Sequence, residues 1–239
     1  MFSKALSRWL YPSWCAQCKR SLHLTEDHLC RPCLLKLTQI RLPICTRCGI
    51  EIPPHGKSTA TCSRCRNRSY QFDEVFPLFR YDDNFKNLLH QVKYERKYWL
   101  LDIFSKRLKR TLPNQSRDLP SCIIPVPLDR NRLRKRTFNQ SLLIAQMISK
   151  ILKIPVKENV MIRKEYRSPQ SWLSRKERLS NLEGLFKIKK RHEIKDQWVL
   201  LVDDVVTTGS TVHECAKIIK EEGASKVTVF TLARTPLAP

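Results

Sequence analysis

The stretch that decides the fold runs Val199-Leu200-Leu201-Val202-Asp203-Asp204-Val205-Val206-Thr207-Thr208-Gly209-Ser210-Thr211. Its first four residues are apolar and lie between polar ones, which predicts a short buried strand of the kind found inside a parallel sheet. Two carboxylates follow at the carboxyl end of that strand, where open α/β sheets bind their ligands. The small, hydroxyl-rich run 207–211 then leads into a helical pattern, so its backbone N–H groups and hydroxyls can hold a phosphate.

Asp203 and Asp204 would repel a bare phosphate, so these two carboxylates need another partner. Sugar hydroxyls or a hydrated Mg²⁺ ion would suit them, and a phosphorylated sugar satisfies both halves of the motif. A plainer alternative treats the acids as a helix cap and residues 207–210 as an ordinary turn. That alternative explains each residue separately but not the ordered run, so we favour a sugar phosphate site.

The composition is strongly basic. The 239 residues include 45 Lys and Arg against 22 Asp and Glu, a formal net charge of +23. Such an excess is typical of proteins that bind a polyanion, with nucleic acid ahead of a membrane surface. No apolar run reaches the length of a spanning helix, and residues 1–14 lack the apolar core of a signal peptide. We therefore expect a cytoplasmic protein with no membrane insertion.

Cysteine pairs dominate the first 70 residues. Eight of the ten cysteines form four Cys-x-x-Cys pairs, separated by 11, 11 and 13 residues. Two thiolates three residues apart can bind one tetrahedral ion and a second pair completes the site, so the series indicates zinc. Interleaved pairing, and ligation by His23, His28 or His55, stay open. We favour two structural Zn²⁺ ions, one on Cys15, Cys18, Cys30 and Cys33, and the other on Cys45, Cys48, Cys62 and Cys65.

The chain therefore divides into a zinc-binding domain over residues 1–70, which needs metal to fold, and a second domain over 71–239. The second domain alternates predicted strands and helices, which indicates an α/β fold with a mostly parallel sheet. An aromatic strand region covers 72–81, and a single helix is expected over 85–112. A final alternating strand is expected over 226–232.

A second anion site is predicted after the strand 122–124. This strand leads through Val126-Pro127-Leu128 into a basic loop over 130–136, and a helix over 141–152 follows. Because parallel strands end at one edge of the sheet, the loop would face the same crevice as residues 203–211 and would take a pyrophosphate. An ordinary solvated turn is the alternative. The basic residues are Arg130, Arg132, Arg134, Lys135 and Arg136.

A third segment, residues 167–186, is polar, basic and interrupted by proline and glycine. We interpret it as a mobile lid that closes on anions and carries Arg175 and Arg178. An exposed amphipathic helix beginning at Ser174 is the alternative.

These segments carry a family resemblance. Residues 199–211 resemble the phosphoribosyl pyrophosphate (PRPP) motif of type I phosphoribosyltransferases, whose two acids hold the ribose hydroxyls and whose loop holds the 5′-phosphate. Nearly the whole chain resembles the competence protein F family. The residues that carry this second resemblance are the four cysteine pairs, Val126-Pro127-Leu128, Phe138-Asn139-Gln140, Gln170, Arg175, Arg178, Asn181, Phe186 and the PRPP motif.

The resemblance implies a zinc-binding N-terminal domain, a C-terminal domain with the type I phosphoribosyltransferase fold, and a role in DNA uptake in naturally transformable bacteria. It suggests PRPP with Mg²⁺, single-stranded DNA, and a DNA-uptake helicase or other competence protein as partners. One departure is Thr137, which stands where the family usually has a glycine; if that glycine serves close backbone approach, the pyrophosphate loop is altered here. The implied PRPP ligands are Val126, Pro127, Leu128, Arg130, Arg134, Arg136 and the run Asp203, Asp204, Val205, Val206, Thr207, Thr208, Gly209, Ser210 and Thr211.

Three functions fit the sequence. The first is an active phosphoribosyltransferase with an unspecified nitrogenous acceptor in nucleotide metabolism, in which Asp203 and Asp204 orient the ribose and Arg175 and Arg178 stabilise the departing pyrophosphate. The second is a DNA-uptake factor that binds single-stranded DNA and uses the PRPP site for control. The third is a zinc scaffold with a relic site. We favour the second, because one small ligand cannot neutralise a charge of +23.

Overall fold

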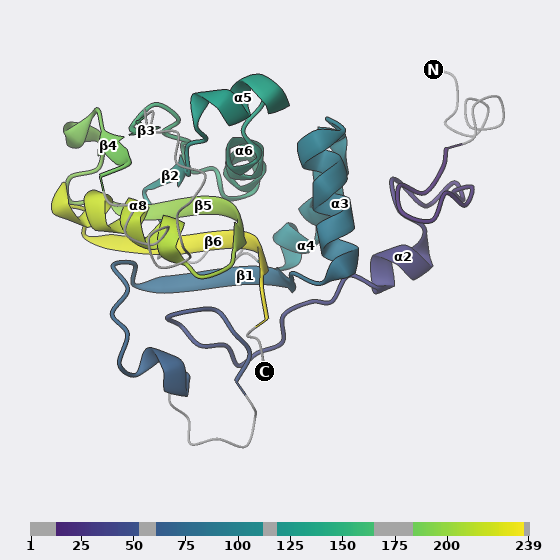
Figure 1. Ribbon diagram of the computed structural model, residues 1–239, viewed down its shortest axis with the longest axis horizontal. Helices are drawn as coiled ribbons and strands as arrows, with labels where there is room; N and C mark the ends of the chain where they lie inside the picture. The colour runs from purple at the N-terminus through teal and green to yellow at the C-terminus, as the bar shows by residue number, and fades with distance from the viewer. Residues whose placement is uncertain (1–12, 53–60, 112–118, 165–183, 237–239) are drawn as a thin grey trace, which may run out of the picture.

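The computed structural model describes residues 13–52, 61–111, 119–164 and 184–236 (Figure 1). Its centre is a four-stranded sheet in the order β1-β6-β5-β2, in which every neighbouring pair is parallel. A separate antiparallel pair joins β3 to β4. The predicted α/β fold with a mostly parallel sheet is therefore confirmed. The strands are β1 (Glu74–Arg80), β2 (Cys122–Pro125), β3 (Met161–Arg163), β4 (Phe186–Ile188), β5 (Trp198–Val206) and β6 (Lys226–Arg234).

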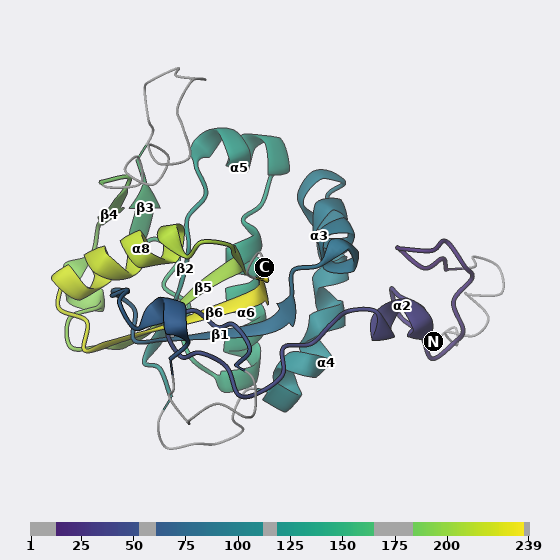
Figure 2. The same cartoon turned by 60° about the horizontal axis from the view of Figure 1, so that its bottom comes forward.

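Helices cover both faces of the sheet (Figures 1 and 2). Successive side chains of β5 point to opposite faces, so Leu200 and Val202 join one buried cluster while Val199 and Leu201 join the other. Burial on both faces explains why this strand is a continuous apolar run in the sequence. The first cluster includes α3 (Asp83–Tyr94), α4 (Asp102–Thr111) and α6 (Gln140–Leu152), and the second includes α8 (Ser210–Glu221) together with β3 and β4.

Apolar and polar residues alternate along the last strand, β6, but its polar residues do not form a solvent-exposed face. This strand lies between β1 and β5 in the middle of the sheet, and all of its residues after Lys226 are buried. Its polar members Thr228 and Thr231 are buried with the rest. Both faces of the strand therefore belong to the core.

The single helix predicted over 85–112 is wrong. Helix α3 ends at Tyr94, Arg96 adopts a positive φ of 57°, and a 3-10 turn over Tyr98–Leu101 leads into α4. A straight helix over the predicted range would be about 42 Å long. The apolar residues on both sides of the break, such as Phe85 and Phe104 with ring centroids 5.4 Å apart, instead pack into one cluster, which requires the chain to turn back.

The basic loop predicted over 130–136 is a short helix, α5 (Arg130–Arg136). The Asp129 side chain caps it by accepting a hydrogen bond from the Arg132 N–H at 2.8 Å. At the other end Thr137 adopts the left-handed conformation, with φ 67°, and donates its N–H to the Leu133 carbonyl at 2.7 Å. The usual glycine at this position therefore suits a backbone conformation that ends the helix.

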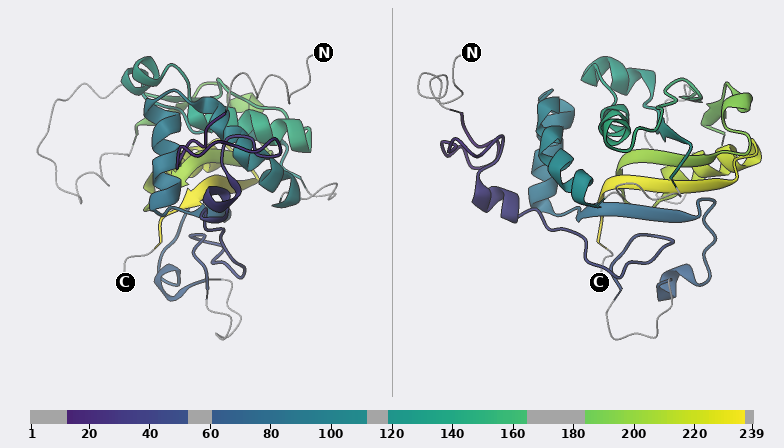
Figure 3. Two further views of the ribbon diagram at one scale, coloured as in Figure 1. Left: turned by 90° about the vertical axis from the view of Figure 1, so that its right-hand side faces the viewer. Right: turned by 180° about the vertical axis from the view of Figure 1, so that it is seen from behind.

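The cysteine-rich residues contact the sheet domain at two places (Figure 3). Residues 13–37, with the short helix α2 (Arg31–Leu35), lie beside α3, where Gln17 Nε2 donates to the Asn84 carbonyl at 2.7 Å. Residues 38–52 follow the free edge of β1, and the Val75 N–H donates to the Thr46 carbonyl at 3.0 Å. Pairing of this kind protects an edge strand. The domain boundary at residue 70 stays a prediction.

The described part of the chain contains no helix that is both long enough and apolar enough to cross a membrane. Its short turns are η1 (Ser63–Cys65), η2 (Tyr98–Leu101) and η3 (Arg191–Glu193).

Replacing Thr137 with glycine should stabilise the protein. A β-branched residue in the left-handed region costs about 1 kcal/mol or more, which exceeds the entropy that glycine adds to the unfolded chain. We expect Thr137→Gly to raise the melting temperature by about 2–4 °C. Thr137→Ala, which keeps the Cβ atom, is the control and should gain less; a glycine variant that melts below the wild type would contradict the prediction.

Candidate functional site

The eight paired cysteines form two separate tetrads. Within each tetrad all four sulfur atoms lie within 4.8 Å of one another. A tetrahedral zinc site with Zn–S bonds of about 2.3 Å has S–S edges of about 3.8 Å. The Cys18 and Cys30 sulfurs are 3.6 Å apart, and those of Cys48 and Cys62 are 3.7 Å apart, so both sites fit structural zinc.

The tetrads combine the cysteine pairs in sequential order, not in the interleaved one. The first zinc site is Cys15, Cys18, Cys30 and Cys33, and the second zinc site is Cys45, Cys48, Cys62 and Cys65. His23 and His28 belong to neither set, and His55 lies outside the described residues. A complete set of four thiolates leaves zinc no open position, which is typical of a structural site.

The acid pair lies inside strand β5, not on a loop beyond it. Strand pairing with β6 continues past both acids to Val206. The Asp204 side chain is only 13% exposed, and its backbone carbonyl accepts a hydrogen bond from the Thr231 hydroxyl at 2.9 Å. The two carboxylates are therefore fixed by the sheet itself.

Each carboxylate has a partner from a different helix. Lys93 Nζ, from the last turn of α3, lies 2.6 Å from Asp204 Oδ2. Ser141 Oγ, from the first turn of α6, donates to Asp203 Oδ1 at 3.1 Å, and the Asp204 N–H donates to the same oxygen at 2.8 Å. Helices α3 and α6 thus meet the strand at the acid pair.

Burial controls the ionisation of Asp203. Burial and then the neighbouring charge of Asp204 raise the pKa of the Asp203 carboxyl to about 7. The Asp204 N–H, Lys93 and the Ser141 hydroxyl oppose this rise but do not cancel it. The site therefore holds a carboxyl group that gives up its proton near neutral pH.

The hydroxyl-rich run 207–211 forms a tight turn that begins helix α8. Gly209 has φ 85°, a conformation that side-chain-bearing residues rarely adopt. Thr208 Oγ1 lies 2.9 Å from Ser210 Oγ and accepts the Ser210 N–H at 3.4 Å. Because the first N–H groups of a helix lack intrahelical partners, this turn and the start of α8 form a candidate phosphate loop beside the acids.

The other predicted anion site begins at the end of β2. The Val126 N–H extends the pairing of β2 with β5 by donating to the Val202 carbonyl at 2.9 Å. Asn139 Nδ2 donates to the Val126 carbonyl at 3.0 Å, and Asn139 also caps α6. These bonds place α5 and its cations over the carboxyl ends of the strands.

The side chains on α5 differ in exposure. Arg136 is buried, donates to the Tyr94 hydroxyl at 3.3 Å and lies over the Tyr94 ring at 5.1 Å. Arg134 and Lys135 are exposed and form no ion pair among the described residues. Figure 2 shows α5 and α3 side by side, consistent with the Arg136–Tyr94 contact.

Three side chains that face the acid pair or its surroundings are not predicted from the sequence. Lys93 and Ser141 contact the acids directly. Arg163, on β3, has a pKa lowered first by burial and then by the charge of Arg132. Only long-range contacts bring these residues here, and nothing in their local sequence marks them. The predicted lid residues Arg175 and Arg178 lie outside the described residues.

Comparisons with known proteins agree with both halves of the chain. The family called phosphoribosyl transferase domain matches residues 139–237, and the double zinc ribbon domain family matches residues 6–66. Competence protein F of Haemophilus influenzae is 30% identical over 225 residues, 92% of this chain and 96% of the relative. DNA utilization protein YhgH of Shigella flexneri is 31% identical over 228 residues, 94% and 98% of the two chains. Competence protein ComFC of Bacillus subtilis is 28% identical over 217 residues, 88% and 85%.

Stability should depend on the Asp203 carboxyl. Its pKa is higher in the folded protein than in the unfolded chain, so its contribution to the free energy of unfolding falls as the pH rises through 7. In thermal melts without ligand, we expect the melting temperature of Asp203→Asn minus that of the wild type to be larger at pH 8 than at pH 5.5. An equal difference at both pH values would contradict the prediction.

Proposed function

The chain belongs to the competence protein F family, and we propose that it binds PRPP with Mg²⁺ and single-stranded DNA during DNA uptake. The main support for PRPP binding is the acid pair of β5, which is followed two residues later by the phosphate loop 207–211. The names of the relatives, which refer to competence and DNA utilization, support the second half of the proposal.

In this proposal the 5′-phosphate of PRPP occupies the phosphate loop and accepts hydrogen bonds from its N–H groups and hydroxyls. Asp203 and Asp204 accept hydrogen bonds from the ribose hydroxyls, and ionised carboxylates are the stronger acceptors. Mg²⁺ neutralises the pyrophosphate, as is usual for phosphorylated substrates. Lys93, 2.6 Å from Asp204, adds a positive charge on the side where the acids would otherwise repel the ligand.

Single-stranded DNA is assigned to the α3–α5 surface, which we define as Tyr94, Tyr98, Trp99, Arg134 and Lys135. The three aromatic side chains are large yet 63%, 54% and 45% exposed. Exposed rings beside cations are typical of surfaces that stack the bases of a single strand and bind its phosphates. The surface is held together by the Arg136–Tyr94 contact and by Tyr98 packing against Phe138, with ring centroids 5.8 Å apart.

The two sites are close, because Lys93 and Tyr94 are neighbours on α3 and Lys93 is paired with Asp204. A strand lying on the α3–α5 surface would therefore pass beside bound PRPP. This proximity supports the proposal that PRPP controls DNA binding.

Loss of the acid charges should weaken PRPP binding. Hydrogen bonds to charged groups contribute about 1.5–3 kcal/mol, so Asp203→Asn and Asp204→Asn should each weaken Mg²⁺-dependent PRPP binding about 10- to 150-fold in calorimetric titrations. Asp73→Asn, before β1 at the opposite end of the sheet, is the matched control and should bind normally. Unchanged affinity in both acid variants would contradict the PRPP assignment. Pyrophosphate release in the presence of nitrogenous acceptors tests catalytic turnover on the same protein.

Trp99→Ala should weaken single-stranded DNA binding. Removing one stacking ring costs about 1–3 kcal/mol, or about 5- to 150-fold in affinity. Replacing Arg134 and Lys135 with glutamine should reduce the salt dependence of log K by about 0.7 for each phosphate that is no longer neutralised. Trp14→Ala, an equally large ring that is 60% exposed beside the first zinc site, is the matched control. If Trp14→Ala weakens binding and Trp99→Ala does not, the DNA site lies on the cysteine-rich residues.

A further inference from the structure

Arg234 is a buried cation at the carboxyl end of β6. Its side chain belongs to a residue only 4% exposed, and among the described residues no carboxylate lies within ion-pair distance of it. Burying a charge without compensation is costly, so its partners identify what holds it in place. Those partners are backbone carbonyls from two parts of the chain that are far apart in sequence.

One partner is at the second zinc site. Arg234 Nε donates to the carbonyl of Cys48 at 2.7 Å, and Cys48 is one of the four cysteines of that site. The other partners lead into the phosphate loop. Arg234 Nη1 donates to the Val206 carbonyl at 3.0 Å and also to the Thr207 carbonyl. A single planar guanidinium therefore joins the second zinc site to the start of the phosphate loop.

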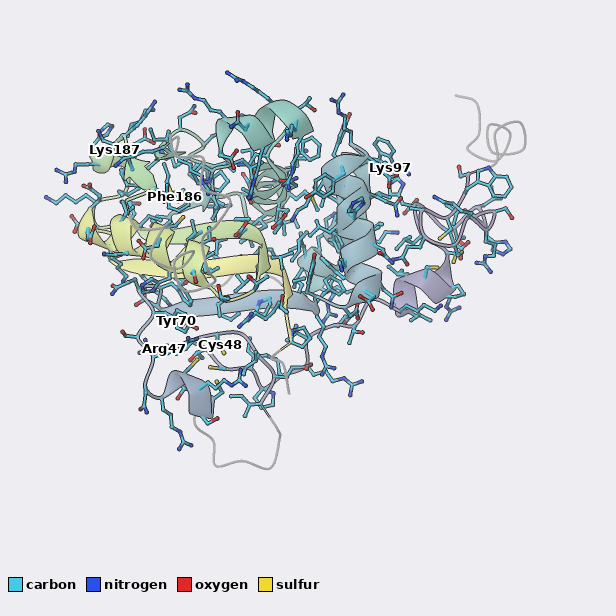
Figure 4. All side chains as sticks on the ribbon, in the orientation of Figure 1. Arg47, Cys48, Tyr70, Lys97, Phe186 and Lys187 are labelled. Carbon is cyan, nitrogen blue, oxygen red and sulfur yellow. The ribbon has the colours of Figure 1, made fainter. Side chains whose placement is uncertain are left out.

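Tyr70 makes a second connection between the same two parts. Its ring packs against the cysteine cluster of the second zinc site, and Figure 4 shows it beside Cys48. On its other side, a Cβ atom added to Gly209 would lie 3.4 Å from Tyr70 Cε1, so the ring is in contact distance of the loop. The same ring contacts His213 in the first turn of α8.

The planar guanidinium of Arg234 fixes the positions of its three carbonyl partners relative to one another. Arginine presents donors in a rigid plane, so the carbonyls of Cys48, Val206 and Thr207 cannot move independently without breaking a charged hydrogen bond. Disorder of the cysteine turn would leave part of the buried charge unpaired. Arg234 would then move relative to the carbonyls of Val206 and Thr207, and the start of the phosphate loop would change its position.

We propose that Arg234 is a positioning residue that fixes the phosphate loop to the second zinc site, so that zinc binding there and PRPP binding at the loop strengthen each other. The inference rests on the proposed PRPP site. Because coupling between the affinities of two ligands is reciprocal, zinc should improve PRPP affinity and PRPP should improve zinc affinity by the same factor. We expect the tighter zinc binding to appear as slower release of zinc.

The first experiment measures PRPP affinity in Arg234→Met, Arg234→Lys and Val229→Ala. Val229 is a buried residue of the same strand, so its truncation lowers the melting temperature without touching the loop. We expect PRPP binding to weaken about tenfold or more in Arg234→Met, less in Arg234→Lys, and not in Val229→Ala. Equal PRPP affinity in Arg234→Met and the wild type would overturn the inference. A wild type that does not bind PRPP would instead overturn the proposed function.

The second experiment measures zinc release to a chromophoric chelator with and without Mg²⁺ and PRPP. Wild-type protein should hold two zinc ions per chain, in agreement with its two tetrads. Cys18→Ser, at an exposed position, leaves only the second site complete. PRPP should slow release from Cys18→Ser about tenfold, within the usual range of coupling.

Adding Arg234→Met to Cys18→Ser should abolish that slowing, whereas adding Val229→Ala should preserve it. This comparison gives a readout that loss of stability alone would not produce, because Val229→Ala is also destabilised. Slowing that survives in the Arg234→Met background, or that is absent from Cys18→Ser at PRPP concentrations that saturate this variant in calorimetric titration, would overturn the coupling.

Discussion

Two adjacent carboxylates at the end of a buried strand are the constraint around which the other elements are arranged. Like charges held together in a protein interior are unfavourable unless each one is paired or hydrogen-bonded. Lys93 supplies the ion pair to Asp204 from α3, and Ser141 supplies a hydroxyl to Asp203 from α6. The pKa of Asp203 is still raised by its burial and by the charge of Asp204, so these partners do not fully offset the cost of the buried charge.

The sequence predicts the elements whose signals are local. The apolar run of β5, the acid pair, the hydroxyl turn and the cysteine pairs all have the residue types that their structures require. Helix α5 resembles a loop in sequence because arginines occur in both, although Asp129 is a recognisable cap. The break after Tyr94 is hidden because apolar residues on both sides keep helical spacing. Lys93 and Arg234 depend on contacts between distant elements, and no local pattern reports those.

Net charge overstates the surface available to a polyanion. Arg136 and Arg234 are both buried, one over the Tyr94 ring and the other on backbone carbonyls. These two guanidiniums hold elements of the fold together. Exposed cations such as Arg134 and Lys135 can face phosphates, and their place on the helix whose Arg136 contacts the exposed Tyr94 ring is more informative than the total of +23. In our proposal the charge points to a polyanionic partner, and the exposed rings and cations define the surface where we expect it to bind.

The cysteine-rich residues are better understood as part of the frame of the candidate site than as an appended module. The first zinc site is linked to α3, since Gln91 Nε2 donates to the Ala16 carbonyl at 3.1 Å, and α3 carries the lysine that neutralises Asp204. The second is linked to the phosphate loop through Arg234. The two tetrads therefore contact different elements around the candidate site, the first through α3 with its Lys93 and the second through Arg234 at the phosphate loop. Because small cysteine-rich segments commonly need metal to fold, we expect the geometry at the end of β5 to depend on metal as well.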